Sequence, residues 1–186
     1  EIASAPVDGL NDITFPFNMA KAPHKSGFFF AQEFSFNYVD NVGHTGLQPR
    51  EDKNGVRIVK AVFSSFIDGT TTDPNCQSRA DGGPGVICAV DVEYDYSHTY
   101  NLVKNAGSGM TWKGTLVDET GYPTDVGEWT LPEGAGKLVT LHDPTSEALG
   151  TSGGEVLNTH EDGDCIGKVA FSAEPVTEGI KIRVGF

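Results

Sequence analysis

The sequence predicts an all-β protein, a two-sheet antiparallel sandwich of the jelly-roll or lectin-like type with few or no helices. Several segments alternate apolar and polar residues with a period of two, which is typical of strands. The 23 glycines and 10 prolines supply turn formers between those segments. No window keeps a helical period of 3.6 residues beyond about two turns. We see no linker, repeat or low-complexity tract, so residues 1–186 are expected to form a single domain.

In the first half of the chain, residues 28–38 predict a long and largely buried strand. One face of this strand would hold Phe28, Phe30, Gln32, Phe34, Phe36 and Tyr38. The segment "GHTGLQPRED" predicts a turn followed by a short strand that ends at Pro49. The segment "GVRIVKAVFSSF" predicts a further strand, with Val59, Ala61 and Phe63 on one face and Lys60, Val62 and Ser64 on the other.

In the second half, residues 89–96 alternate apolar residues with acids. The residues after a tight bend, "TYNLVKN", predict a second strand. The segments "GMTWKGTLVDETG" and "VGEWTLP" predict two strands joined by a turn, and residues 167–186 predict two short strands at the end of the chain.

The formal net charge of −13 excludes several classes of partner. Nucleic acid and anionic membrane surfaces would be repelled, because no Lys/Arg cluster offsets the charge. The longest apolar runs, such as "GFFFA", are too short to span a membrane. An acidic surface keeps a secreted protein soluble and also suits a neutral or cationic partner, such as a sugar or a metal ion.

The cysteines and the first residues point to secretion. The chain begins "EIASAPVDG", without Met or an apolar targeting segment, as expected of a mature protein whose signal peptide has been removed. Cys76 and Cys88 bracket a turn-rich loop and are the expected disulfide, worth about 3 kcal/mol by loop closure. Cys165 would be free or available for intermolecular pairing. The sequence contains neither a redox C-x-x-C motif nor four zinc ligands in short paired spacings.

The acids Asp91, Glu93 and Asp95 are the candidate catalytic groups, because alternate residues of a strand share a face. Carboxylates two residues apart begin about 6.5–7 Å apart, close to the about 5–5.5 Å of retaining glycosidases. Jelly-roll β-glucanases, however, place their acids in the order E-x-D-x-E, and "DVEYD" has the reverse order. A solvated strand face is therefore the favoured interpretation. No other common catalytic motif occurs.

Calcium is the candidate metal. The segments "DGTTTDPN", "RADGGPG" and "HEDGDC" offer carboxylates beside glycines, although none has the EF-hand spacing. The alternative is that these acids only cap turns.

Carbohydrate recognition needs an aromatic platform and polar groups that can bond paired hydroxyls. Trp112 and Tyr38 are candidate platforms, although a strand Trp is more often part of a core. Gln48 and Arg50 lie two apart on a predicted strand, so both could make fork-like hydrogen bonds on one face. Other residues that could contribute are Trp129, Tyr122 and Asn101.

The ordered segments "GHTGLQPRED", "AVFSSFIDGTTTDPNC", "ADGGPGVICAV", "TWKGTLVDETG" and "VGEWTLPEGAG" resemble small secreted fungal proteins related to the bacterial DUF3472 domain. The resemblance covers roughly residues 28 to 136 and fades after Leu138. It implies a β-sandwich, an extracellular location and, in bacteria, an association with polysaccharide-related proteins, but no catalytic mechanism. The closest motif matches are Gln48, Arg50, Cys76, Asp81, Gly82, Gly83, Cys88, Trp112 and Asp118.

Together these observations predict a secreted protein that binds a glycan or cell-wall polysaccharide without transforming it. Gln48 and Arg50 would bond hydroxyls, Trp112 or Tyr38 would stack on a ring, and Asp81 would shape the site or act as a ligand from the disulfide loop. One alternative is a glycoside hydrolase or polysaccharide lyase that uses Asp91 and Glu93. A defence or toxin protein with a protein or lipid partner is the third possibility.

Overall fold

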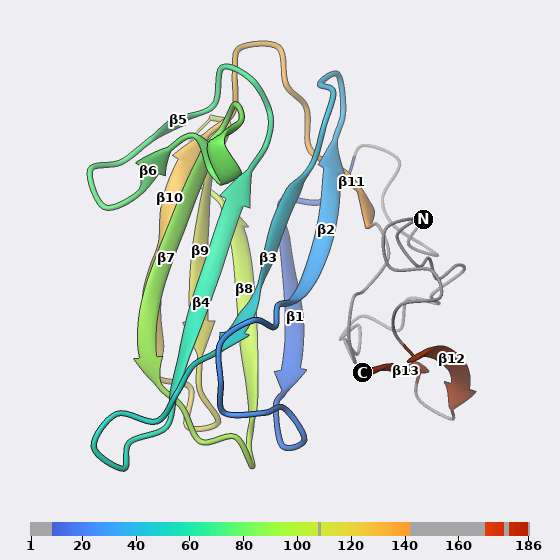
Figure 1. The fold of residues 1–186 in the computed structure, drawn as a ribbon. Coiled ribbons are helices and arrows are strands. Elements are labelled where there is room, and N and C mark those ends of the chain that lie inside the picture. Colours follow the sequence, from blue (N-terminus) through green and yellow to red (C-terminus); the bar gives the residue numbers. More distant parts are fainter. Residues whose placement is uncertain (1–8, 108, 142–169, 177–178, 186) are drawn as a thin grey trace.

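The alternating segments form two antiparallel sheets that pack face to face in the computed structural model, which describes residues 9–107, 109–141, 170–176 and 179–185. One sheet has the strand order β1-β8-β9-β10-β5 and the other has the order β11-β2-β3-β4-β7-β6 (Figure 1). The strands of the first are β1 (Asp12–Asn18), β8 (Thr99–Ala106), β9 (Thr111–Val117), β10 (Pro123–Thr130) and β5 (Thr71–Thr72). Those of the second are β11 (Leu138–Leu141), β2 (Phe30–Phe36), β3 (Gly43–Pro49), β4 (Ile58–Ser65), β7 (Val86–Glu93) and β6 (Gln77–Ser78).

The fold class is confirmed: this is an all-β sandwich. The helical content of the described residues is one short 3-10 turn, η1 (Ala80–Gly82). The expected terminal strands form a hairpin of their own, β12 (Ala170–Val176) paired with β13 (Gly179–Gly185).

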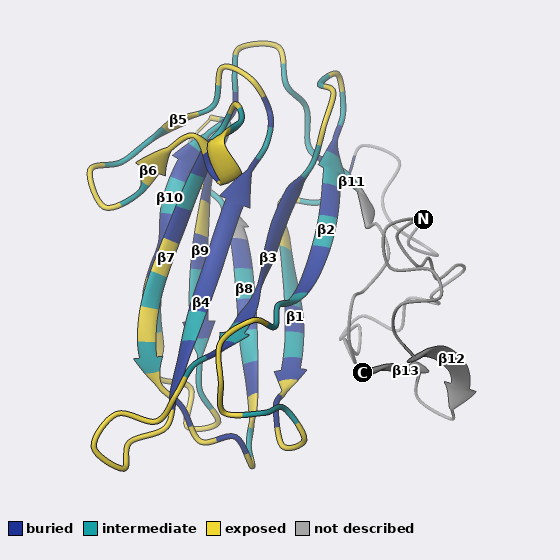
Figure 2. Cartoon of the chain, viewed as in Figure 1, coloured by how far each residue is buried: buried dark blue, intermediate teal, exposed yellow. Residues whose placement is uncertain are grey.

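The core lies between the two sheets, where the apolar faces of the strands meet (Figure 2). Phe63 of β4 stacks on Trp129 of β10 with ring centroids 4.6 Å apart, and Phe36 of β2 meets Trp112 of β9 edge to face. Both Trp side chains are buried, at 1% exposure or less. Burial of such large rings is a major stabilising contribution to a sandwich of this size.

Four strands, β1, β5, β6 and β11, were not predicted from the sequence. Strand β1, "DITFPFN", contains Pro16, which is unfavourable inside a sheet, but β1 lies at a sheet edge where a missing N–H is tolerated. Strand β11 has only four residues and also lies at an edge. Short edge segments carry too little alternation for a pattern to detect.

The disulfide between Cys76 and Cys88 is present, as predicted. It joins the loop before β6 to the core face of β7, because Cys88 is fully buried there. Its sulfur atoms lie over Gly127 of β10, where a Cβ would come within 2.6 Å of the Cys76 Sγ. The disulfide loop is thereby held against both sheets. Cys165 lies outside the described residues.

The two predicted aromatic platforms are not part of an open binding face. Tyr38 lies outside the strand in which it was predicted, and Trp112 is buried in the core. Strand β2 ends at Phe36, and Tyr38 lies in the following turn with φ 66° and 86% exposure. The left-handed backbone at Tyr38 ends the alternation, so its prediction as part of the buried strand face is wrong. Trp112 shares the core face of β9 with Leu116, and its ring is covered by the opposite sheet.

No helix among the described residues is long and apolar enough to cross a membrane.

Candidate functional site

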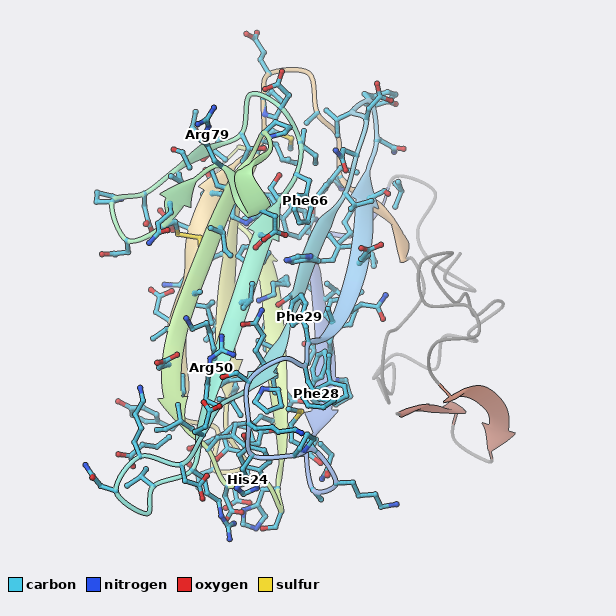
Figure 3. The ribbon with its side chains drawn as sticks, in the orientation of Figure 1. His24, Phe28, Phe29, Arg50, Phe66 and Arg79 are labelled. Atoms are coloured by element: carbon cyan, nitrogen blue, oxygen red, sulfur yellow. A yellow bond between two sulfur atoms is a disulfide. The ribbon has the colours of Figure 1, made fainter. Side chains whose placement is uncertain are left out.

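The outer face of the β11-β2-β3-β4-β7-β6 sheet carries a cavity of about 430 Å³. Successive side chains of a strand point to opposite faces, so the neighbours of the core-facing residues in β2, β3, β4 and β7 reach this outer face. We call the cavity the β3 groove. It is lined by Phe29, Ala31, Glu33, His44, Gln48, Val62, Phe66, Asp81 and Ile87. Figure 3 shows Phe29, Phe66 and Arg50 along this side of the molecule.

His44 of β3 lies among the groove's aromatic rings and is only 8% exposed. Its ring meets those of Phe29 and Phe66 edge to face, at centroid distances of 5.1 and 4.8 Å. Burial lowers the pKa of His44 to about 4, although the Asp81 carboxylate partly opposes this shift. The imidazole is therefore neutral at physiological pH and can offer one hydrogen-bond donor and one acceptor.

Gln48 and Arg50 lie together, as their spacing predicted. The guanidinium of Arg50 donates through Nη2 to Oε1 of Gln48 and through Nη1 to the carbonyl of Pro49 at 3.2 Å. These bonds fix the orientation of the Gln48 amide. Its NH₂ group keeps two donors that are available to a ligand in the β3 groove.

Asp81 reaches the same groove from the disulfide loop. It lies in η1 with φ 48°, between Arg79 (φ 71°) and Gly82 (φ 81°). The loop approaches β4 closely at Gly85, where a Cβ would come within 2.0 Å of the Ser65 carbonyl oxygen, so only glycine fits. The disulfide and this close approach together place an exposed carboxylate beside His44.

Sequence reasoning missed four residues of the β3 groove that carry its aromatic and polar character: Phe29, Glu33, His44 and Phe66. A signal for two of them was present, because Phe29 and Glu33 occupy positions opposite to the core-facing residues of β2. Glu33 pairs with His44 across β2 and β3. That pairing depends on a register between two strands, and neither strand alone reveals it.

The remaining candidate binding residues lie elsewhere. Tyr38 lies on the turn between β2 and β3, with its ring over Gly136, and does not line the groove. Trp112 belongs to the core. The structure thus brings Gln48, Arg50 and Asp81 to one side of the sheet and leaves the two predicted aromatic platforms away from it.

Asp91 and Glu93, the candidate catalytic pair, are exposed on the outer face of β7. The carboxylate of Asp91 lies 3.3 Å from the Nζ of Lys53 and 3.9 Å from that of Lys60. Neither acid lines the β3 groove. Their surroundings are those of a charged strand surface.

Within the described part of the chain, no three His, Cys, Asp or Glu side chains come together as metal ligands. In "DGTTTDPN", Asp68 and Asp73 accept hydrogen bonds from the backbone N–H groups of Gly69 and Asn75. In these bonds the carboxylates cap their own turns. The segment "HEDGDC" lies outside the described residues, and calcium stays a prediction.

No protein-family model, curated protein or solved structure matches this chain. The resemblance to proteins related to the DUF3472 domain therefore stays a prediction.

Proposed function

We propose that this protein binds a glycan in the β3 groove. The observation that carries the proposal is the composition of the groove, which combines the rings of Phe29 and Phe66 with four polar side chains, those of Glu33, His44, Gln48 and Asp81. Sugar recognition uses this combination, because apolar ring surface covers C–H groups while fixed polar groups bond the hydroxyls.

The dimensions of the groove suit more than one sugar ring. His44 and Gln48 are four residues apart on β3, which is about 13 Å at a rise of about 3.3 Å per residue. Arg50 follows Gln48 at one end and Asp81 lies near His44 at the other. A chain-like ligand lying along β3 would meet the polar groups in succession.

The donors are also held in place before a ligand arrives. Arg50 orients the amide of Gln48, and close packing between Phe29 and Phe66 holds the ring of His44. A site whose side chains are already ordered loses less conformational entropy on binding. This favours a binding function for the groove.

Secretion is part of the same proposal. The Cys76–Cys88 disulfide is of the kind that persists in oxidising compartments and is rare in the cytosol. An extracellular location would bring the protein to cell-wall polysaccharides.

Affinity electrophoresis in gels containing cell-wall polysaccharides, followed by calorimetry with oligosaccharides, tests the proposal. At least one polymer should retard the protein, and Gln48→Ala should weaken binding by about tenfold, the effect of one lost hydrogen bond to a buried group. Gln77→Ala, on the exposed strand β6, is the matched control and should bind like the parent. If no polymer retards the protein, or if Gln48→Ala and Gln77→Ala weaken binding equally, the β3 groove is not a glycan site.

A further inference from the structure

The β3 groove carries negative charge without cationic residues in its lining. Glu33 and Asp81 are its two ionisable acids, and none of the nine lining residues is Lys or Arg. Neither carboxylate forms an ion pair with any described residue; the ion pairs of that part of the chain involve other acids. Both charges are thus available to a ligand.

His44, in the same groove, is a second and independent indication of a ligand. More than nine-tenths of its surface is buried, it lines the cavity, and no described residue forms a hydrogen bond with its ring. The ring nitrogens are not among the fully buried side-chain atoms that lack a partner in the described residues, so they remain accessible from the groove. A ligand group in the groove can therefore bond the neutral imidazole.

The imidazole also adds no positive charge that could neutralise the carboxylates. Burial keeps the pKa of His44 at about 4, so the ring is neutral at physiological pH. A cavity lined by one sign of charge concentrates the field of that charge. The formal net charge of −13 on the whole chain acts in the same direction.

From the juxtaposition of Glu33, Asp81 and the unpartnered His44, we infer that the groove takes a glycan whose sugar units carry a free, protonated amine. This inference rests on the proposed function and names its ligand class as an amino sugar without its N-acetyl group. The ammonium group would lie between the two carboxylates, and a neighbouring hydroxyl would bond the His44 ring. Gln48, held by Arg50, would bond hydroxyls toward the other end of the groove.

The probes are a glucosamine oligomer, the N-acetylglucosamine oligomer of the same length and a neutral glucose oligomer, each titrated calorimetrically into the full chain. The glucosamine oligomer should bind at least about tenfold more tightly than the other two, the effect of a charge-assisted hydrogen bond. Its affinity should fall as salt rises. Its affinity should also fall as the pH rises through the pKa of the sugar amine, because the ammonium group then loses its proton.

Glu33→Gln and Asp81→Asn should each remove most of that preference while keeping side-chain size, and circular dichroism will show that both remain folded. Glu133→Gln and Asp12→Asn, exposed acids outside the groove, are the matched controls and should change nothing. If both controls weaken binding as much as the groove variants, the preference reflects net charge alone and the inference is wrong.

The outcomes separate the inference from the proposed function. Equal or tighter binding of the acetylated or neutral oligomer, unaffected by Asp81→Asn, overturns the inference and leaves glycan binding intact. Binding of spermidine or of a lysine peptide, with no oligosaccharide bound, overturns both in favour of a cationic partner of another class. If no probe binds, both the inference and the proposed glycan-binding function are wrong, and no other ligand class takes their place.

Discussion

The Nζ atom of Lys104 lies 4.3 Å from the centroid of the Phe63 ring, inside the core between the two sheets. Lys104 of β8 is fully buried and its Nζ has no hydrogen-bond partner in the described structure. The space for it comes from Gly114 of β9, where a Cβ would come within 2.8 Å of the Nζ. Contact with the face of Phe63 is the main favourable interaction of the ammonium form.

Replacing this lysine should stabilise the protein. Burial lowers the pKa of Lys104 well below its usual value, because the charged form is poorly solvated in the core. Lys104→Met keeps a similar shape, so the free energy of unfolding at pH 7 should rise by about 1–4 kcal/mol. Urea unfolding measures this, and Lys113→Met, at an exposed position of β9, is the control with little effect. A less stable Lys104→Met would contradict the prediction.

The advantage of Lys104→Met should depend on pH with a defined sign. Between the lowered pKa of the folded state and the usual value near 10.5, the unfolded chain binds more protons at Lys104 than the folded chain does. Unfolding of the parent therefore becomes less favourable as pH rises through that window. The stability difference between the variant and the parent should shrink from pH 7 to about pH 10. A constant difference would mean that the two states protonate Lys104 alike.

His44 should make the protein acid-sensitive. Its pKa is 6.5 in the reference state and about 4 in the folded protein, so in this window the unfolded state binds the extra proton. Stability is present above pH 6.5 and is lost as pH falls through 4, by up to about 3 kcal/mol. His44→Gln removes the titrating group. The difference in the free energy of unfolding between parent and variant should therefore change by this amount between pH 7 and pH 4. Parallel pH profiles would show that His44 does not carry this loss.

The Cys76–Cys88 disulfide should contribute a large part of the free energy of unfolding. The double variant Cys76→Ser, Cys88→Ser opens a loop with a sequence separation of 12, which costs about 3 kcal/mol by loop entropy. Thermal unfolding with and without a reductant provides the measurement. The reductant should lower the melting temperature of the parent but leave that of the double variant unchanged. Equal melting temperatures of the parent and the double variant would rule out this contribution.

Gly127 and Gly121 form a matched pair for testing how the disulfide is packed. Both have positive φ, at 132° and 86°. A Cβ on Gly127 would come within 2.6 Å of the Cys76 sulfur, whereas a Cβ on Gly121 would meet nothing within 4 Å. Gly121→Ala should cost about 1 kcal/mol through backbone strain alone. Gly127→Ala should lower the free energy of unfolding by at least about 2 kcal/mol more than Gly121→Ala, because overpacking adds to backbone strain. Urea unfolding measures both effects. Equal effects would disprove the close packing around Gly127.

The sequence predicted the fold better than the site because the two depend on different information. The period of two in "GVRIVKAVFSSF" is local and sorts the residues of β4 onto two opposite faces. The spacing of Gln48 and Arg50 is equally local, and the two side chains do make contact. The β3 groove instead depends on strand order and register, which place Glu33 beside His44 and bring the Asp81 loop over β3. Trp112 illustrates the same limit, since alternation alone does not tell which face of a strand a second sheet will cover.

Arg50 should act on the ligand through Gln48. Its guanidinium bonds the Gln48 amide but does not line the groove, so its effect on binding should come mainly from orienting that amide. Arg50→Ala and Gln48→Ala should each weaken glycan binding, and the double variant should lose little more than the larger single effect. Calorimetry of the four proteins gives the coupling energy directly, and a value of at least about 1 kcal/mol is expected for residues in contact. Arg57→Ala, which removes an exposed cation outside the groove, is the control. Additive effects would mean that Arg50 meets the glycan independently, and no effect of Arg50→Ala would mean that the Gln48 amide is oriented without it.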